Sequence, residues 1–412
     1  MPGADPSLPR PSDIVVTGLG AVSPFGWGAN ALWEGARRGL TAVGPFTRFD
    51  ASRHRTHLAA QVPPEDKGIE PARDLSVADR FAVASAREAI ASARLDLDSC
   101  RERTGVFFGS SAGGMLEGEL FLETYIRAGR RHARRELVAS QQFNGPGDAV
   151  ARAIGAGGQV ETISSACASA AMAIGSALRA LRRGDVDVAL AGGSDALCQL
   201  TYGGFNALRS VDELPSRPFR KDRTGLSLGE GAGVLVLESA AHAARRGAET
   251  IAVLAGEAST CDAHHMTAPQ SDGSGAAAAI RLALTDAGVA PDDVDFVNAH
   301  GTGTPLNDAA EAAALKAVFG ERARSIPLTS TKALIGHLLG SAGAVEAVVT
   351  VFGLLHREVH PMPEGGALDP ELGLDLVLGV PRPLSRASCA ISTSLAFGGA
   401  NAVLVFTRRA TA

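Results

Sequence analysis

Short runs of apolar and β-branched residues alternate along the chain with longer runs rich in alanine. This pattern is typical of strands that alternate with helices, and it predicts a layered α/β fold. Ten of the short runs are expected to form strands: residues 13–20, 105–111, 160–164, 186–193, 233–238, 251–260, 294–303, 326–333, 389–399 and 401–406.

The last five of these runs repeat the arrangement of the first five. The clearest correspondence is between residues 162–181, TISSACASAAMAIGSALRAL, and residues 328–349, LTSTKALIGHLLGSAGAVEAVV. Both pass from a polar strand end into a helix rich in Gly, Ala and Ser, which indicates a duplicated unit. We expect a disordered arm over residues 1–12, followed by two halves, 13–250 and 251–412, that share one core.

Composition removes several classes of function. A chain of 412 residues, 45% hydrophobic, can bury a large core. Its net charge of -5 and the lack of a basic, aromatic-rich array argue against a nucleic-acid partner. No apolar signal region and no run of 18 apolar residues is present, so we expect a cytoplasmic protein that does not span a membrane. The five cysteines are odd in number and widely spaced, which favours reduced thiols over disulfides or a zinc site.

Cys167 stands where a predicted strand passes into a predicted helix. The helix should begin at Cys167 and end near Arg182, Arg183 and Gly184. Unsatisfied N–H groups at a helix N-terminus lower the pKa of a thiol, which would make Cys167 a nucleophile. The alternative is a buried cysteine that acts as a small hydrophobic residue.

Two histidines favour the nucleophile. His300 follows a predicted strand inside a Gly/Thr loop, with Asp308 and Glu311 spaced as a capping box for the next helix. His337 lies among glycines that would weaken a helix, with Lys332 and Glu346 on either side. Each histidine alone could be structural, but a thiol with two histidines is typical of nucleophilic catalysis.

The chain resembles the β-ketoacyl-[acyl carrier protein] synthases, condensing enzymes of the thiolase superfamily. The resemblance covers nearly the whole chain and rests on long motifs in the family's order, which include residues 15–26, 217–238, 262–269, 300–308, 330–346 and 395–401. It implies a thiolase-like fold of five layers, α-β-α-β-α, with two duplicated halves, and usually a dimer.

The resemblance also assigns roles. Cys167 would take an acyl chain from the phosphopantetheine of an acyl carrier protein, and His300 and His337 would stabilise the enolate formed when malonyl carrier loses CO2. The backbone N–H groups of Cys167 and Phe397 would form an oxyanion hole. Lys332, together with Glu346, would order His337 and the charges around it. The resemblance implies no metal and no organic cofactor. The remaining implied residues are Gly398 and Gly399 at the gate, Asp308 and Glu311 in support, and Thr267, Thr302 and Thr304 along the pantetheine channel.

Two further features concern the substrate and its carrier. Ala112, with Phe205, is assigned to the acyl pocket, and it is smaller than the branched residue common in fatty acid enzymes. A longer, rigid or unsaturated chain would therefore fit, as in polyketide or polyene synthesis. The basic residues Arg130, Arg131, Arg134, Arg135 and Arg209 are either a solvated face or the docking surface for an acidic carrier protein.

Other interpretations stay open or are excluded by particular residues. A silent chain-length-factor-like partner subunit would lack Cys167, although this chain could pair with such a subunit. A coenzyme A thiolase would carry a second active cysteine near the C-terminus, and Cys389 precedes the loop where it is expected. A decarboxylating variant would have glutamine at position 167. His264 and His265 have no third ligand at metal spacing.

Overall fold

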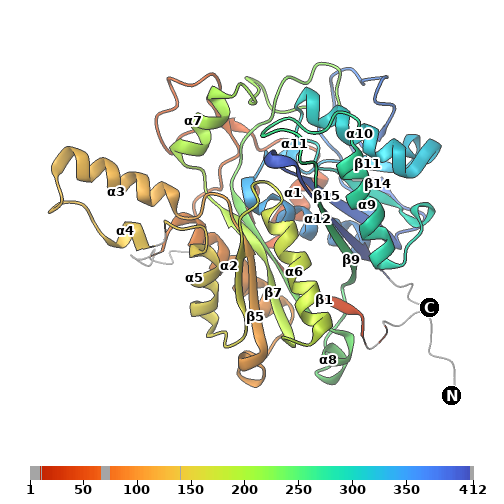
Figure 1. Cartoon of the computed structure of the whole chain (residues 1–412), viewed down its shortest axis with the longest axis horizontal. Helices are drawn as coiled ribbons and strands as arrows, with labels where there is room; N and C mark the ends of the chain where they lie inside the picture. Colours follow the sequence, from red (N-terminus) through yellow and green to blue (C-terminus); the bar gives the residue numbers. More distant parts are fainter. Residues whose placement is uncertain (1–9, 11, 66–74, 140, 409–412) are drawn as a thin grey trace.

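The computed structural model describes residues 10, 12–65, 75–139 and 141–408 (Figure 1). The predicted arm over residues 1–12 lies outside these residues, apart from Arg10 and Ser12. A layered α/β architecture is present, as the alternation of strands and helices predicts.

The main sheet contains a strand in each of the ten predicted runs. Its order is β13-β11-β10-β15-β16-β9-β1-β8-β7-β5-β6, with the short β2 beside β1. The strands are β1 (Ile14–Ser23), β2 (Gly26–Trp27), β5 (Thr104–Gly109), β6 (Val160–Ile163), β7 (Val188–Asp195), β8 (Gly231–Ser239), β9 (Ala252–Cys261), β10 (Phe296–Asn298), β11 (Pro327–Thr329), β13 (Asp375–Leu376), β15 (Cys389–Leu395) and β16 (Ala400–Thr407). Two small hairpin sheets pair β3 (Gly44–Pro45) with β4 (Leu58–Ala59) and β12 (Glu358–Val359) with β14 (Arg382–Pro383).

The predicted duplication is visible in the strand order. In chain order, the first half has strands β1, β5, β6, β7 and β8, and the second has β9, β10, β11, β15 and β16. When the strands of each half are numbered one to five in chain order, both halves have the order 3-2-4-5-1 from the outer side of the sheet to its centre. The parallel and antiparallel pairings also match, since the second strand of each half is parallel to both neighbours and the fifth is antiparallel to both. The halves join where β1 pairs with β9, through Val15 and Val16.

Helices complete five layers. The middle layer is α6 (Ser169–Arg183) and α12 (Ala342–His356), which contact each other and strands of both halves. Outside the first half lie α2 (Val77–Ser92) and α5 (Gly145–Ile154), and outside the second lie α9 (Ser274–Ala287) and α10 (Pro305–Phe319). The remaining helices are α1 (Ala29–Arg37), α3 (Met115–Ala128), α4 (Glu136–Ala139), α7 (Gln199–Ala207), α8 (Ala240–Arg245) and α11 (Lys332–Ile335), with 3₁₀ turns that include η5 (Leu339–Ser341) and η6 (Phe397–Gly399).

Small residues allow the two middle helices to approach closely. A Cβ atom on Gly343 would lie 2.9 Å from the Ala171 side chain, so α12 meets α6 at a position where only glycine fits. Gly184 ends α6 in a left-handed conformation, as its position after two arginines predicts. Gly343 and Ala171 both lie near the beginning of their helices, so the N-terminal ends of α12 and α6 lie close together.

One segment, Leu339–His356, is long and apolar enough to cross a membrane by length and composition. It contains the middle-layer helix α12, and 89% of the segment is buried inside the protein. Its hydropathy is therefore explained by a position in the centre of the fold, between the strands of both halves.

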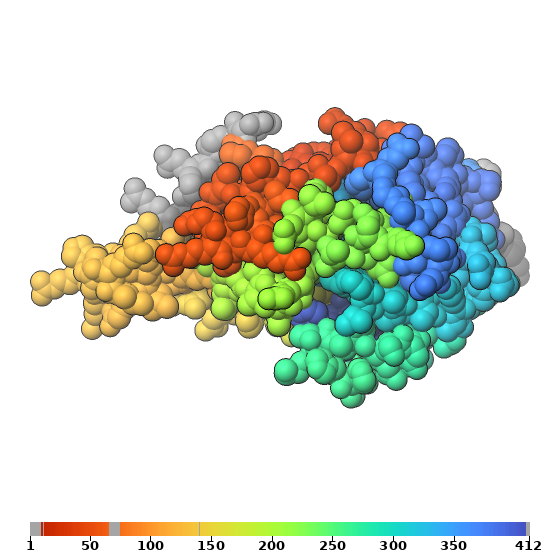
Figure 2. All heavy atoms as spheres, turned by 90° about the horizontal axis from the view of Figure 1, so that it is seen from above, coloured from red at the N-terminus to blue at the C-terminus, as the bar shows by residue number. Residues whose placement is uncertain are grey.

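A hairpin of α3 and α4 projects from one side of the body (Figures 1 and 2). Helix α3 exposes a set of large apolar side chains, and the basic residues 130–135 follow it at the tip. The exposed apolar residues are Leu120, Leu122, Tyr125 and Ile126. An exposed apolar surface of this kind is typical of a contact with another protein.

Candidate active site

Cys167 lies in a sharp turn between β6 and α6. Ala166 has a left-handed φ of 46°, and helix α6 begins at Ser169, two residues later than the sequence predicts. The Ser169 hydroxyl accepts a hydrogen bond from the Ser165 N–H (2.8 Å) and donates one to the Ala166 carbonyl (2.6 Å). The cysteine is therefore held in the turn before the helix, and its side chain is buried.

The expected low pKa of the thiol is wrong. Burial raises the pKa of Cys167 to about 11, more than the Lys332 charge and the N–H groups of Phe397 and Cys167 lower it. The expectation considered the helix terminus and omitted the desolvation of an enclosed site, which disfavours a thiolate. The resting thiol is protonated. The two N–H groups predicted to form an oxyanion hole are nevertheless the ones that face its sulfur.

His300 follows β10, and a carboxylate on α10 fixes its backbone. Glu311 accepts hydrogen bonds from the N–H groups of His300 and Gly301, each at 2.8 Å, and from the Thr393 hydroxyl at 2.7 Å. Gly301 has a φ of 38°, which the turn requires. Glu311 is buried, and its three hydrogen bonds fix the backbone of the loop that contains His300.

Asp308 and Glu311 do not form the predicted capping box. Helix α10 begins at Pro305, after Thr304, so both carboxylates lie inside the helix. Asp308 instead accepts from the Phe219 N–H (2.7 Å) and the Gly303 N–H (3.2 Å). Of the donors to these two carboxylates, Phe219 and Thr393 come from distant segments, whereas Gly303 belongs to the loop just before the helix.

His337 lies between α11 and η5, and its ring is held in one tautomer. Its Nδ1 accepts a hydrogen bond of 3.0 Å from the Leu339 N–H, so the neutral ring carries its proton on Nε2. Within the described chain, Nε2 is buried without a hydrogen-bond partner, as is Nδ1 of His300. The two rings are nearly perpendicular, with centroids 5.4 Å apart.

Both histidines are neutral in the folded protein. Burial lowers the pKa of each well below its usual value, and the positive charge of Lys332 lowers both further. A neutral His337 with its proton on Nε2 can donate a hydrogen bond to a developing negative charge. The unpartnered nitrogens therefore suit an oxygen supplied by a substrate.

Lys332 and Glu346 form a buried ion pair beside the histidines, each 2% exposed. Burial raises the pKa of Glu346 to about 7, although Lys332 opposes the shift. The second carboxylate oxygen, Oε2, is buried without a partner among the described residues. The pair fixes a positive charge in an enclosed space, where its effect on nearby groups is strong.

One pocket of about 330 Å³ brings the predicted residues together. Its lining contains the thiol and both histidines, with Phe205 and Phe397 stacked at 5.7 Å between ring centroids. The threonines predicted for the channel, Thr267, Thr302 and Thr304, also line it, together with Arg209.

The gate segment and two residues missed in the sequence form one network. Gly398, with a φ of 82°, donates its N–H to the Met266 carbonyl at 2.7 Å. Asn401 donates to Asp262 at 2.7 Å, and both line the pocket. Gly399 accepts from the Asp262 N–H at 2.8 Å. The motif at 395–401 contains Asn401, but only the fold shows that Asp262 is its partner.

Two groups of predicted residues lie away from the pocket lining. Ala112 is fully buried in an apolar cluster with Tyr202 and Leu339, and Phe205 packs between that cluster and the pocket. The basic residues Arg130, Arg131, Arg134 and Arg135 lie between α3 and α4, whereas Arg209 lines the pocket. The four arginines of the hairpin are therefore not part of the pocket lining.

Among the described residues, no cluster of three or more His, Cys, Asp or Glu is arranged to hold a metal ion. His264 and His265 are exposed, and His265 Nδ1 accepts from the N–H groups of Thr267 and Ala268, each at 3.1 Å. The ring of His265 thus shapes the turn at the pocket rim.

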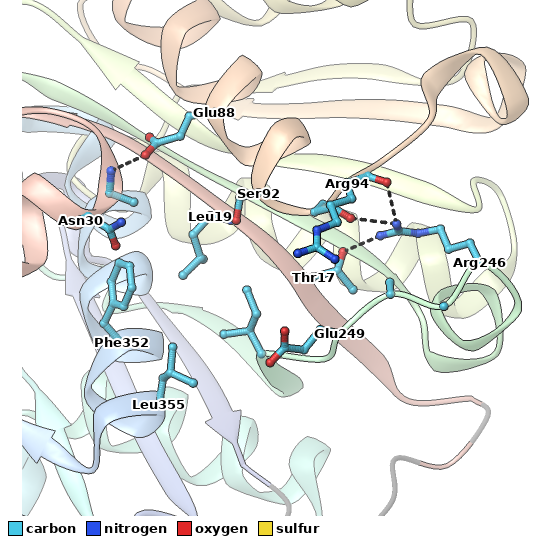
Figure 3. A pocket seen from close by; sticks show the side chains of 15 residues that line it. Thr17, Leu19, Asn30, Glu88, Ser92, Arg94, Arg246, Glu249, Phe352 and Leu355 are labelled. Atoms are coloured by element: carbon cyan, nitrogen blue, oxygen red, sulfur yellow. Dashed lines mark hydrogen bonds between the residues drawn. The ribbon is translucent and has the colours of Figure 1, made fainter.

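A second hollow, of about 570 Å³, shares no lining residue with this pocket (Figure 3). Glu88 accepts there from the N–H groups of Ala21 and Ala29, each at 2.8 Å. Arg246 donates to the carbonyl oxygens of Ala93 (2.8 Å) and Arg94 (3.3 Å). The second hollow is larger, but it contains none of the predicted site residues.

Comparisons with known proteins agree on one family. Residues 11–243 match the family model "Beta-ketoacyl synthase, N-terminal domain", and residues 251–365 match "Beta-ketoacyl synthase, C-terminal domain". The chain is 38% identical over 406 residues to 3-oxoacyl-[acyl-carrier-protein] synthase 2 of Staphylococcus aureus (strain N315), with 95% of this chain and 97% of the relative covered.

Solved structures give the same result. The ishigamide ketosynthase/chain length factor is similar with a TM-score of 0.91 and 34% identity, over 96% of this chain and 98% of that one. AntDE:AntF, a type II PKS acyl-carrier protein in complex with its ketosynthase bound to the hexaketide, is similar with a TM-score of 0.88 and 31% identity, over 97% and 100%. The chain therefore belongs to the β-ketoacyl synthase family and is an acyltransferase of the β-ketoacyl-acyl carrier protein synthase type.

Proposed function

We propose that this synthase extends polyketide or polyene chains, with Cys167 as the nucleophile and His300 and His337 as donors to the enolate. The observation that carries the proposal is the presence of a thiol and two neutral histidines in one enclosed pocket, each histidine with a buried, unpartnered ring nitrogen. Such atoms are costly to bury unless a substrate completes their hydrogen bonds.

In the first half-reaction, the sulfur of Cys167 attacks the thioester carbonyl of an acyl carrier. A bond forms between sulfur and the acyl carbon, the carbon–sulfur bond to pantetheine breaks, and the thiol proton leaves with the pantetheine sulfur. The backbone N–H groups of Cys167 and Phe397 lie near the sulfur, which supports their proposed role as donors to the oxyanion at the attacked carbon.

In the second half-reaction, malonyl carrier loses CO2, and the electron pair of the broken carbon–carbon bond passes into an enolate. His337 Nε2–H donates to the enolate oxygen, and His300 supplies the second donor. The enolate carbon then bonds to the acyl carbon, and Cys167 leaves as thiolate, giving a 3-oxoacyl carrier two carbons longer. Electrons balance without an oxidant or reductant, so the proposed reaction needs no redox cofactor.

Lys332 acts on this step through charge and position. Its charge lowers the pKa of both histidines, which keeps the rings neutral, so that each ring donates from a single nitrogen. Glu346 holds the ammonium group in place. Asp308 and Glu311 fix the backbone around His300.

The preference for a polyketide or polyene chain rests on the acyl side of the pocket. Ala112 belongs to the buried apolar cluster against which Phe205 packs, so a movement of Phe205 would extend the pocket toward a small residue. Similar structures include the ketosynthase bound to a hexaketide.

Carrier protein and partner subunit are proposed to meet different surfaces. Arg209 at the pocket rim suits an acidic carrier protein, and the exposed side chains Leu208, Leu306 and Met266 surround it. The arginines of residues 130–135 lie on the hairpin of α3 and α4, which projects from the body (Figures 1 and 2), and they are proposed to reach that docking surface from a second subunit. A homodimer or a pair with a chain-length-factor-like subunit, in the cytoplasm, would satisfy this arrangement.

The test of the reaction is intact-mass spectrometry of the protein mixed with acyl carriers. Wild type should gain the mass of the acyl group, and Cys167→Ala should not. Addition of malonyl carrier should then release a product two carbons longer. If wild type stays unmodified both alone and with a co-purified partner subunit, the proposed activity is wrong.

The chain preference is tested with a series of saturated and polyunsaturated acyl carriers of equal length. Wild type should accept the rigid chains, and Ala112→Ile should lose them while it keeps short saturated chains. A wild-type preference for saturated chains that Ala112→Ile leaves unchanged would remove the polyketide or polyene proposal but not the condensation.

A further inference from the structure

Asp195, at the end of β7, is fully buried and was not among the residues predicted from sequence. Its Oδ1 accepts hydrogen bonds from the loop after β5, namely from the Ser110 hydroxyl (2.7 Å) and the N–H groups of Ala112 (2.8 Å) and Gly113 (3.2 Å). One carboxylate therefore fixes the backbone of the loop that carries Ala112.

The other oxygen of Asp195 binds the loop of the catalytic histidine. Oδ2 accepts from the Gly340 N–H at 2.6 Å and from the Ser111 hydroxyl at 3.1 Å. The Gly340 N–H also lies 2.9 Å from the Ser111 hydroxyl oxygen. A Cβ on Gly340 would approach Asp195 Oδ2 to 2.7 Å, so the contact is too close for any residue but glycine.

Gly340 directly follows the residue that fixes the tautomer of His337. Leu339 donates its N–H to Nδ1 of His337 and has a left-handed φ of 55°, which is strained for leucine. A strained residue keeps its conformation only when its surroundings hold it. The bond from Gly340 to Asp195 holds the C-terminal side of Leu339, and so maintains the direction of the Leu339 N–H.

The acyl side meets the same turn through its side chains. Leu339 packs in the apolar cluster that contains Ala112. A shift of the loop after β5 would therefore reach Leu339 by two routes, through this packing and through the Asp195 carboxylate. Asp195 contacts neither the sulfur nor a ring nitrogen of the site, so any effect on the reaction passes through the two loops.

We propose that Asp195 is a positioning residue that couples the acyl-pocket loop at Ala112 to the hydrogen-bonding tautomer of His337. When the loop is in place, the carboxylate holds Gly340 and the Leu339 N–H keeps the proton of His337 on Nε2. His337 can then donate from Nε2 to the enolate only when the loop that carries Ala112 is correctly packed. This inference rests on the proposed role of His337 in the malonyl step.

The first test separates the two half-reactions of Asp195→Asn. The asparagine side chain has the size of the aspartate side chain, but its NH2 group would face N–H and O–H donors in place of one carboxylate oxygen, so the hydrogen bonds to that oxygen would be lost. The rate of condensation from pre-acylated enzyme should fall by about tenfold or more, while acylation of Cys167 changes by less than about threefold. A purely structural role would lower the yield of folded protein and slow both steps equally, and would overturn the proposal.

A matched pair of serine variants removes one hydroxyl each from the same carboxylate. Ser111→Ala loses the hydroxyl that contacts both Asp195 and Gly340, and should slow condensation by about tenfold. Ser110→Ala loses a hydroxyl that contacts Asp195 and Gly113 only, and should change condensation by less than about twofold. Equal effects of the two substitutions would contradict the coupling to His337.

A double-mutant cycle shows whether Asp195 acts through His337. In a His337→Ala background, Asp195→Asn should slow condensation by less than about twofold more, because the tautomer it maintains is gone. A full, additive loss would overturn the inference. If His337→Ala alone leaves condensation unchanged, the proposed role of His337 fails instead, so the two failures are distinguishable.

Discussion

Two of the hollows in the described part of this molecule, the pocket at Cys167 and the second hollow, differ in how their buried polar atoms are satisfied. The pocket at Cys167 is the smaller, about 330 Å³ against about 570 Å³, yet it contains buried nitrogens on His300 and His337 without partners among the described residues. In the second hollow, Glu88 and Arg246 bind backbone groups (Figure 3), and Arg246 also pairs with the carboxylate of Glu238.

The difference teaches that volume alone is a poor guide to function. A polar group that the protein satisfies is part of the structure, whereas one left buried and unpaired has a free-energy cost that a substrate can remove. The second hollow joins α1, α2, β1 and the segment between the halves, and its polar side chains hold those elements together. In the Cys167 pocket, by contrast, His300 Nδ1 and His337 Nε2 have no partner among the described residues, so they are free to bind a substrate.

The largest effect should come from the unpartnered histidines. His300→Ala and His337→Ala should each slow condensation by about a hundredfold or more, because each removes a donor to the enolate. Acylation of Cys167 should change by less than about tenfold, because backbone N–H groups serve that step. Quenched-flow mass spectrometry measures the rates of acylation and condensation in both variants. An equal fall in the two rates would contradict the claim that the histidine nitrogens of the Cys167 pocket are reserved for the enolate.

A buried ion pair should also distinguish the pocket. Lys332→Met leaves the carboxylate of Glu346 buried without its cation, which should lower the free energy of unfolding by about 3–5 kcal/mol. Urea unfolding measures the loss, and the double variant Lys332→Met with Glu346→Gln should recover part of it. An unchanged midpoint in the single variant would mean that the pair is solvated rather than enclosed.

The thiol should titrate as a buried group. With a pKa of about 11, the rate of alkylation of Cys167 by iodoacetamide should rise about tenfold for each pH unit between 7 and 10. Peptide mass spectrometry follows this site apart from the other cysteines, with Cys167→Ala as the blank. A plateau above pH 8.5 would show that the helix terminus outweighs burial.

The smallest effect on rate should come from the second hollow. Glu88→Gln keeps one acceptor but opposes an amide to the N–H of Ala21 or Ala29, so stability should fall by about 1–2 kcal/mol. Both half-reactions should stay within about twofold of wild type, since no lining residue is shared with the pocket. A larger loss of condensation at full folding would give the second hollow a part in the reaction.

Much of the fold could be predicted because its signals are local. Each of the ten strand runs has its own apolar pattern. The similarity of residues 162–181 to residues 328–349 agrees with the repeated strand order of the two halves. Cys167, His300 and His337 lie in long motifs, and the pocket brings them together. Their individual roles in the reaction stay predictions.

The incorrect expectations concern a local turn and contacts between distant segments, neither of which the apolar pattern encodes. The helix after Cys167 begins later because Ala166 takes a left-handed turn, and the thiol pKa is raised because several distant segments enclose it. Asp308 and Glu311 bind backbone groups that only the folded chain brings near. Asp195 gave no signal, because an aspartate at a strand end is common and its partners come from two segments that are far apart in the sequence.

The most direct test of the central claim is CO2 release from malonyl carrier by the Cys167→Ala variant. If the histidines are donors that wait for an enolate, decarboxylation should continue without the thiol, while no acyl-enzyme forms. The further substitution His337→Ala should then stop the release. A folded Cys167→Ala protein that binds malonyl carrier but releases no CO2 would contradict the account.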